Sequence, residues 1–233
     1  MKKETALEFL FYSYFKINFE TAENKEQLIK AAIERAYVDA ASHVLKFNNE
    51  KELTDEEKNE IRQGCKGEAI SILLKHFDGE KSISDNWQKD LANSLKKEYD
   101  NTGLEFTFGI AQKWINMTVK YLYIMNSVLK LIETENHVLD DICKRYDKNI
   151  DVPVDDFIIR AACDNKIGVP CRNDNKEYIG MNDTYSCKIP WSQWDEEYYT
   201  DFQKNIKDKV DNNGILDYEN KLWIKEAMNR NGK

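Results

Sequence analysis

The distribution of proline is the feature of this 233-residue chain that most constrains its fold. All three prolines, Pro153, Pro170 and Pro190, lie in the last third of the sequence. A proline inside a helix removes one backbone hydrogen bond and clashes with the preceding turn, so helix interiors exclude it. The proline-free first two thirds of the chain are therefore predicted to form long, uninterrupted helices.

Apolar residues recur at helical spacing along most of the chain, whereas strand patterns are scarce. Thr54 and Glu57 match a capping box, and Ser84 and Ser192 are the predicted caps of two later helices. The predicted fold class is mainly α. Helices are expected over residues 4–19, 24–47, 54–76, 84–99, 110–130, 135–147, 155–162, 192–209 and 217–228.

The region after Pro153 differs in amino-acid composition from the helical part that precedes it. Residues 165–189 are polar and contain several glycines and asparagines, which predicts a long loop or a small hairpin. The chain is longer than one typical domain and shorter than two. We expect residues 1–233 to form one compact unit or a two-lobed helical bundle, with lobes over about 1–100 and about 101–233.

Composition and charge indicate a globular protein. No run of about 18 apolar residues occurs, so no membrane span is predicted. The basic and aromatic N-terminus contains Glu4 and Glu8, and we interpret it as a first helix rather than a signal peptide. The net charge of −8 argues against uniform binding to nucleic acid, but it permits a local basic cleft.

The five cysteines include no short-spaced pair of the kind that zinc ribbons use. Free thiols in a reducing cytoplasm are therefore the default expectation. The alternative is an iron–sulfur cluster on Cys143, Cys163, Cys171 and Cys187, although their intervals are wider than in the common cluster patterns. The three histidines have no metal-ligand spacing, and neither a metal nor another cofactor is predicted.

The sequence "FGIAQKW", residues 108–114, places a lysine in the opening turn of the predicted helix 110–130. Two adjacent apolar stripes make this a central helix. Its remaining face, which carries Lys113, Asn116 and Lys120, is a solvated polar face on the simplest interpretation. Lys113 differs from its neighbours because the positive end of the helix dipole disfavours its charged form. A neutral amine there is a candidate nucleophile.

The sequence "VPVDDFIIR", residues 152–160, places Asp155 and Asp156 at a helix start after an extended lead-in. The simplest interpretation is an N-cap, a position that aspartate favours. A carboxylate anchored at a helix N-terminus is also rigid and ionised. These are the properties that an electrostatic catalyst needs.

Together, the two segments resemble the helix-hairpin-helix DNA glycosylases, including the 8-oxoguanine glycosylase-like branch. That family has a hairpin of the form L-P-G-V-G-x-K and, later, an extended P-V-D segment that leads into a helix. "TFGIAQK" aligns Gly109 with the first glycine and Lys113 with the lysine nucleophile of the bifunctional members. "PVDDFIIR" aligns Asp155 with the catalytic aspartate. Phe108 and Ala111 depart from the hairpin pattern, and the interval from Lys113 to Asp155 is longer than usual.

The resemblance implies a helix-hairpin-helix element and a DNA glycosylase, with or without lyase activity, that flips a modified or damaged nucleotide out of DNA. Lys113 would attack the sugar, and Asp155 would stabilise the sugar cation. The implied DNA-backbone contacts are Gly109, Ala111 and Lys120. The implied base pocket is Trp194, Tyr198, Phe202 and Gln203, although core packing is the simpler interpretation of these residues. We expect a cytoplasmic monomer that acts in bacterial DNA repair or phage defence.

Two other functions remain open. The first is a non-catalytic reader of modified DNA with the same fold. The second is an acidic helical module that binds or inhibits a basic partner protein. A glycosylase or a reader needs residues such as Lys96, Lys97, Lys113 and Lys120 around one cleft, whereas an inhibitor would present a continuous acidic face.

Overall fold

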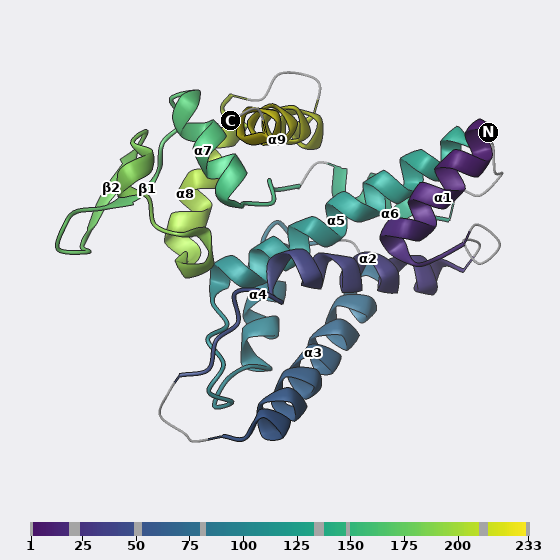
Figure 1. Cartoon of the computed structure of the whole chain (residues 1–233), viewed down its shortest axis with the longest axis horizontal. Helices are drawn as coiled ribbons and strands as arrows, with labels where there is room; N and C mark the ends of the chain where they lie inside the picture. Colours follow the sequence, from purple (N-terminus) through teal and green to yellow (C-terminus); the bar gives the residue numbers. More distant parts are fainter. Residues whose placement is uncertain are drawn as a thin grey trace. The chain divides into compact units, whose positions relative to one another are not determined.

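The computed structural model describes residues 2–18, 24–48, 53–79, 83–132, 138–147, 150–209 and 214–231. Most of these residues are helical, so the mainly α prediction is confirmed (Figure 1). The chain forms two compact units, residues 1–106 with 114–149 and residues 107–113 with 150–233. The two units are therefore interleaved along the sequence. In the part of the chain that the structure describes, no helix is both long and apolar enough to cross a membrane.

The first unit consists of helices. They are α1 (Lys3–Phe15), α2 (Lys25–Ala40), α3 (Asp55–Asp78), α4 (Trp87–Lys97), most of α5 (Phe108–Leu131) and α6 (Asp140–Tyr146). Trp114 of α5 is fully buried, and its indole nitrogen donates a hydrogen bond to the carbonyl of Ile33 at 2.9 Å. The two apolar stripes of α5 thus make it a core helix, as the sequence predicts.

Of the three caps predicted at serine or threonine, one is present and two are not. The capping box of Thr54 and Glu57 is present at the start of α3. Ser84 is not a cap, because α4 begins three residues later at Trp87. Ser192 is not a cap either: it lies in the 3-10 turn η4 (Trp191–Gln193), and Asp195 caps the next helix through the amide of Tyr198 at 2.9 Å. A serine is a cap only where the backbone around it begins a helix.

Several helices are shorter than their sequence patterns suggest. α1 ends where Lys16 adopts a left-handed conformation with φ of 61°. α2 ends at Ala40; residues 41–44 form a turn, and an isolated bridge between Phe47 and Leu104 follows. α6 begins at Asp140; residues 135–137 of its predicted range lie outside the described residues. Tertiary pairing at Phe47 replaces the helical bonds that the local pattern favours.

The second unit contains the first turns of α5, then α7 (Asp156–Asp164), β1 (Val169–Arg172), β2 (Tyr178–Asn182), the 3-10 turns η3 (Tyr185–Cys187) and η4, α8 (Glu196–Lys207) and α9 (Ile215–Asn231). The polar stretch 165–189 forms the small hairpin that we predicted as an alternative to a loop. Its strands are antiparallel and pair Val169 with Asn182. The side chain of Asn173 closes the turn by accepting from the amide of Glu177 at 2.9 Å.

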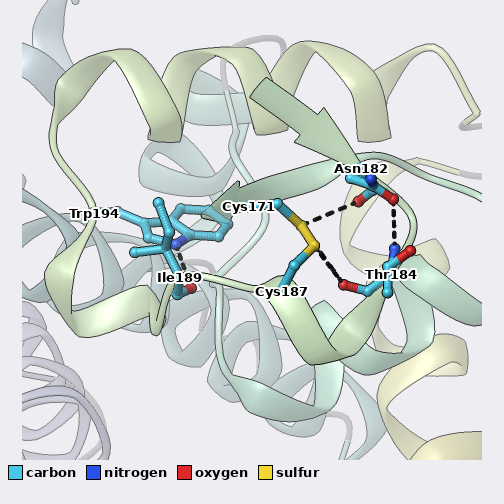
Figure 2. Close-up of a disulfide and its surroundings, with 6 residues drawn as sticks. All are labelled: Cys171, Asn182, Thr184, Cys187, Ile189 and Trp194. Carbon is cyan, nitrogen blue, oxygen red and sulfur yellow. Dashed lines mark hydrogen bonds between the residues drawn. A yellow bond between two sulfur atoms is a disulfide. The ribbon is translucent and has the colours of Figure 1, made fainter. Parts of the chain in front are cut away.

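A disulfide joins Cys171 of β1 to Cys187 of η3 (Figure 2). The expectation of five free thiols is therefore wrong for this pair, whereas Cys65, Cys143 and Cys163 are free and buried. The chain after the hairpin returns to β1, where an isolated bridge between Cys171 and Lys188 brings the two cysteines together across 16 positions of sequence. Among the described residues, no group of three or more His, Cys, Asp or Glu side chains is placed to hold a metal ion.

Candidate functional site

The start of α5 packs tightly against the segment that precedes α8. The amide of Gly109 donates to the carbonyl of Trp194 at 2.9 Å, and the hydroxyl of Thr107 donates to the carbonyl of Ser192 at 2.7 Å. A Cβ on Gly109 would overlap the carbonyl oxygen of Trp191. Glycine is thus needed here for a close approach of two backbone segments within this unit.

The amides of the hairpin motif are used inside the protein. Besides the amide of Gly109, the amide of Ala111 donates to the carbonyl of Thr107 at 3.1 Å. Ala111 is also fully buried. A phosphate contact through these two amides would therefore have to displace bonds within the unit. Their role at the DNA backbone stays a prediction.

Lys113 is a buried lysine packed on an indole ring. It is only 8% exposed, and its Nζ lies 4.1 Å from the centroid of the Trp191 ring. Because α5 begins at Phe108, Lys113 lies in the second turn, beyond the free amides on which our dipole argument relied. What distinguishes this lysine is its burial against the aromatic face of Trp191.

The polar face of α5 is not solvated near its start, contrary to the simplest interpretation. Asn116 is fully buried, and its side-chain carbonyl accepts from Nε2 of Gln88 at 2.9 Å. Lys120, in the first unit, is 9% exposed. Only toward the C-terminal end is this face open, where Lys130 is exposed and forms an ion pair with Asp140. Polar side chains that are buried to this extent normally have partners that compensate for the loss of water.

Asp155 is the N-cap of α7, as its position in the sequence predicts. One carboxylate oxygen accepts from the amide of Ile158 at 2.9 Å. The other accepts from the indole nitrogen of Trp223 on α9 at 3.0 Å. Both oxygens are therefore held, which fixes the orientation of the carboxylate. The contact with Trp223 has no local sequence signal.

The lead-in to Asp155 is clamped against α8 by two buried polar side chains. Gln203 accepts from the amide of Val152 at 2.9 Å and donates to its carbonyl at 2.8 Å. Asp151 accepts from the hydroxyl of Tyr199 at 3.2 Å and forms an ion pair with Lys207. Both polar ends of Gln203 are thus engaged with the main chain, and its observed role is to support the segment that carries Asp155.

The other predicted base-pocket residues are mostly in the core. Trp194 is buried, donates from its indole nitrogen to the carbonyl of Ile189 at 2.8 Å, and packs edge-on against the buried ring of Phe202. Tyr198 is half-buried, and its ring lies 4.4 Å from that of Tyr178. Core packing, the simpler interpretation, describes Trp194 and Phe202 in this structure. Of the four residues, only Tyr198 reaches the surface.

A charge cluster around Asp156 was missed by the sequence reasoning. Asp156 pairs with Lys188, accepts from Arg230 at 2.7 Å and from the hydroxyl of Tyr185 at 2.9 Å, and lies 3.9 Å from Arg160. Burial alone would raise the pKa of Asp156, but the bonds from Lys188, Arg230 and Tyr185 outweigh burial and lower this pKa from 3.8 to about 2. The partners come from three elements, so no spacing in the sequence reveals them.

The second unit therefore contains both a buried amine, Lys113, and an anchored carboxylate, Asp155. Each is in contact with an indole ring, Trp191 for the amine and Trp223 for the carboxylate. Buried lysines and doubly anchored carboxylates are typical of functional sites as well as of structural networks. No family model, no curated protein and no solved structure matches the chain.

Proposed function

We propose that the protein is a DNA glycosylase that excises a modified or damaged base, with Lys113 and Asp155 as its catalytic residues. The observation that supports this proposal is that a buried lysine and an aspartate with both oxygens anchored belong to the same compact unit. They occupy the positions at which the chain resembles the helix-hairpin-helix glycosylases. The helix-hairpin-helix element itself, around residues 101–112, is part of this proposal.

In the proposed reaction, the neutral amine of Lys113 attacks C1′ of a flipped nucleotide. The glycosidic bond breaks, and the departing base takes the bonding electron pair and a proton. Asp155 stabilises the positive charge that develops on the sugar. Ring opening then gives a Schiff base on Lys113, from which elimination cleaves the strand. In a monofunctional version, water attacks in place of Lys113.

The proposed partner is DNA, bound by a monomer in the cytoplasm during repair or phage defence. Lys120, Gly109 and Ala111 are the proposed backbone contacts, and Tyr198 is the surface residue of the proposed base pocket. The net charge of −8 requires that binding use local cations. Arg160, Lys188 and Arg230 are the proposed cations nearest in contact to the Asp155–Asp156 pair; DNA would have to compete with their ion pairs to Asp156 and, for the two arginines, to Glu226.

A borohydride trap tests the chemistry. The full-length protein is incubated with a panel of duplexes, each with one modified base, and covalent complexes are counted after reduction. We expect trapping on at least one duplex and its loss in Lys113→Gln, because glutamine cannot form a Schiff base. Lys130→Gln, on the same helix but exposed, is the matched control and should trap normally. Trapping by Lys113→Gln at the parental rate would exclude Lys113 as the nucleophile.

Asp155→Asn tests the carboxylate separately. Removing one electrostatic group of this kind costs about 10²–10³ in rate. Asparagine caps a helix about as well as aspartate, but it has one acceptor oxygen where Asp155 uses two, so thermal unfolding is measured alongside. Base release by Asp155→Asn at the parental rate, in a variant that remains folded, would leave Asp155 with a purely structural role.

A non-catalytic reader of modified DNA is the second candidate. It is favoured by the hydrogen bonds that already occupy both oxygens of Asp155. A reader would bind one duplex of the panel more tightly than unmodified DNA, without releasing base and without a covalent trap.

A further inference from the structure

The geometry points to a reversible thiol–disulfide exchange site at Cys171–Cys187, in which a dithiol attacks the sulfur of Cys187. The exchange is independent of the reaction proposed above. The two cysteines differ in access: Cys171 is fully buried, whereas Cys187 is half-buried at the surface of η3. An attacking thiolate must reach the sulfur along the S–S bond, so the partly exposed Cys187 is the sulfur that it reaches.

Carbonyl groups stand beside both sulfurs and suit the reduced state. Sγ of Cys187 lies 3.0 Å from the carbonyl oxygen of Thr184 (Figure 2). Sγ of Cys171 lies 3.6 Å from the same oxygen and 4.0 Å from that of Asn182. In the disulfide these are S···O contacts, because neither sulfur carries a proton. After reduction each S–H has an acceptor in place, so reduction leaves no buried thiol without a partner.

The flanks of the cross-link are held without it. The amide of Ile189 donates to the carbonyl of Pro170 at 2.8 Å, and the indole of Trp194 donates to the carbonyl of Ile189 at 2.8 Å. The hairpin strands also pair with each other. Breaking the disulfide therefore removes one constraint on a short stretch, residues 184–188, rather than on the whole hairpin; bonds within η3 and the bridge between Lys188 and Cys171 remain. Exposure of a sulfur to an attacking thiol is typical of reversible disulfides rather than of purely structural ones.

The stretch 184–188 contains two residues of the Asp156 cluster. The hydroxyl of Tyr185 and the ammonium of Lys188 both contact Asp156 at the start of α7. Lys188 directly follows Cys187 and also packs on the Tyr185 ring at 4.5 Å. Reduction consequently loosens two of the contacts that hold Asp156, next to the carboxylate of Asp155.

The exchange balances as a two-electron transfer from a dithiol. One thiolate of the dithiol attacks Cys187, the S–S bond breaks, and Cys171 leaves as a thiolate that takes up a proton. The second thiol of the dithiol then attacks the mixed disulfide and releases the Cys187 thiol. The dithiol is oxidised to its own disulfide, and the protein gains two thiols.

The first experiment identifies the attacked sulfur. The oxidised full-length protein is treated with glutathione, and mixed disulfides are located by peptide mass spectrometry. We expect glutathione on Cys187 and none on Cys171. Glutathione on Cys171, or no mixed disulfide until the protein unfolds, would overturn the proposal and leave a structural cross-link. Cys163→Ser, which removes a buried free thiol in α7, is the matched control and should behave as the parent.

The second experiment measures the structural response by amide hydrogen exchange before and after reduction with dithiothreitol. The amides of Cys187 and Lys188 are bonded within η3, to Thr184 and Tyr185, and we expect their exchange to accelerate about tenfold or more. The amides of Asn173 and Lys176 at the hairpin tip should not change. Cys187→Ser should resemble the reduced parent. Identical exchange in the two redox states, or loss of protection throughout the second unit, would contradict a local reversible site.

Discussion

Gly109 shows, at the scale of one residue, that packing decides which group a glycine in a motif allows to approach. The sequence suggests a glycine that lets a phosphate approach the backbone. In the structure the approaching group is the carbonyl of Trp191, and the amide of Gly109 is bonded to Trp194. The same residue type satisfies both requirements, because each needs the absence of a Cβ. Lys113, four residues on, likewise owes its character to the ring of Trp191.

Gly109→Ala should destabilise the second unit, since its methyl group would overlap the Trp191 carbonyl. Overpacking of this kind costs about 1–3 kcal/mol of unfolding free energy. The measurement is urea unfolding followed by tryptophan fluorescence. Gly67→Ala in α3 is the matched control: its Cβ meets no atom within 4 Å, so the change should stabilise the helix by about 0.5–1 kcal/mol. Equal stability of the parent and Gly109→Ala would mean that the 191–194 segment does not pack as described.

At the scale of elements, the segment that carries Asp155 is positioned by two helices. Gln203 of α8 holds the main chain of Val152, and Trp223 of α9 holds the carboxylate of Asp155. The extended lead-in has few backbone partners of its own, so these side chains stand in for a neighbouring strand. α8 and α9 thereby hold the start of α7 in place, and with it Asp155 and Asp156.

Gln203→Ala removes the partners of both main-chain groups of Val152, which is fully buried. Leaving a buried donor and a buried acceptor unpaired costs about 2–4 kcal/mol. Chemical unfolding should report this loss, and amide exchange at Val152 should accelerate. Gln193→Ala, an exposed glutamine in η4, serves as the comparison and should change stability by less than about 0.5 kcal/mol. A Gln203→Ala variant as stable as the parent would contradict the clamp.

At the scale of the whole molecule, acidification acts on the two units in different pH ranges. In the first unit, burial, with a contribution from Arg145, lowers the pKa of His76 from 6.5 to about 4. In the second unit the pKa of Asp156 is lowered from 3.8 to about 2. For both groups the pKa in the folded state is lower than in the unfolded chain. As the pH falls, the unfolded state therefore takes up protons first, and the free energy of unfolding decreases. The first unit is affected between about pH 6.5 and 4, and the second between about pH 4 and 2.

Stability measured at pH 7, 5 and 4 tests the contribution of His76. Neutral His76 favours the folded state above pH 6.5, and this contribution, at most about 3 kcal/mol, is lost as the pH falls toward 4. His76→Phe keeps an aromatic ring beside Trp87 and should flatten this part of the pH profile. His43→Gln changes an exposed histidine and should leave the slope intact. An unchanged slope in His76→Phe would assign the acid sensitivity to other groups.

The sequence alone determined what depends on neighbours a few residues apart. Helical periodicity, the box at Thr54 and the cap at Asp155 arise from interactions within one turn, so local patterns record them. The predicted caps at Ser84 and Ser192 are wrong because a capping residue does not by itself start a helix. Both serines carry the right chemistry at positions where the surrounding chain follows another path.

Only the tertiary structure decided the partners that lie far apart in the chain. Trp223 is 68 residues from Asp155, and Cys187 reaches Cys171 only because the chain after the hairpin returns to pair Lys188 with Cys171. The burial of Lys113, Asn116 and Gln203 follows from the elements that cover them, and a polar residue carries no local mark of being covered. The sequence determines the chemistry of each side chain, whereas its burial and its distant partners depend on how the chain packs.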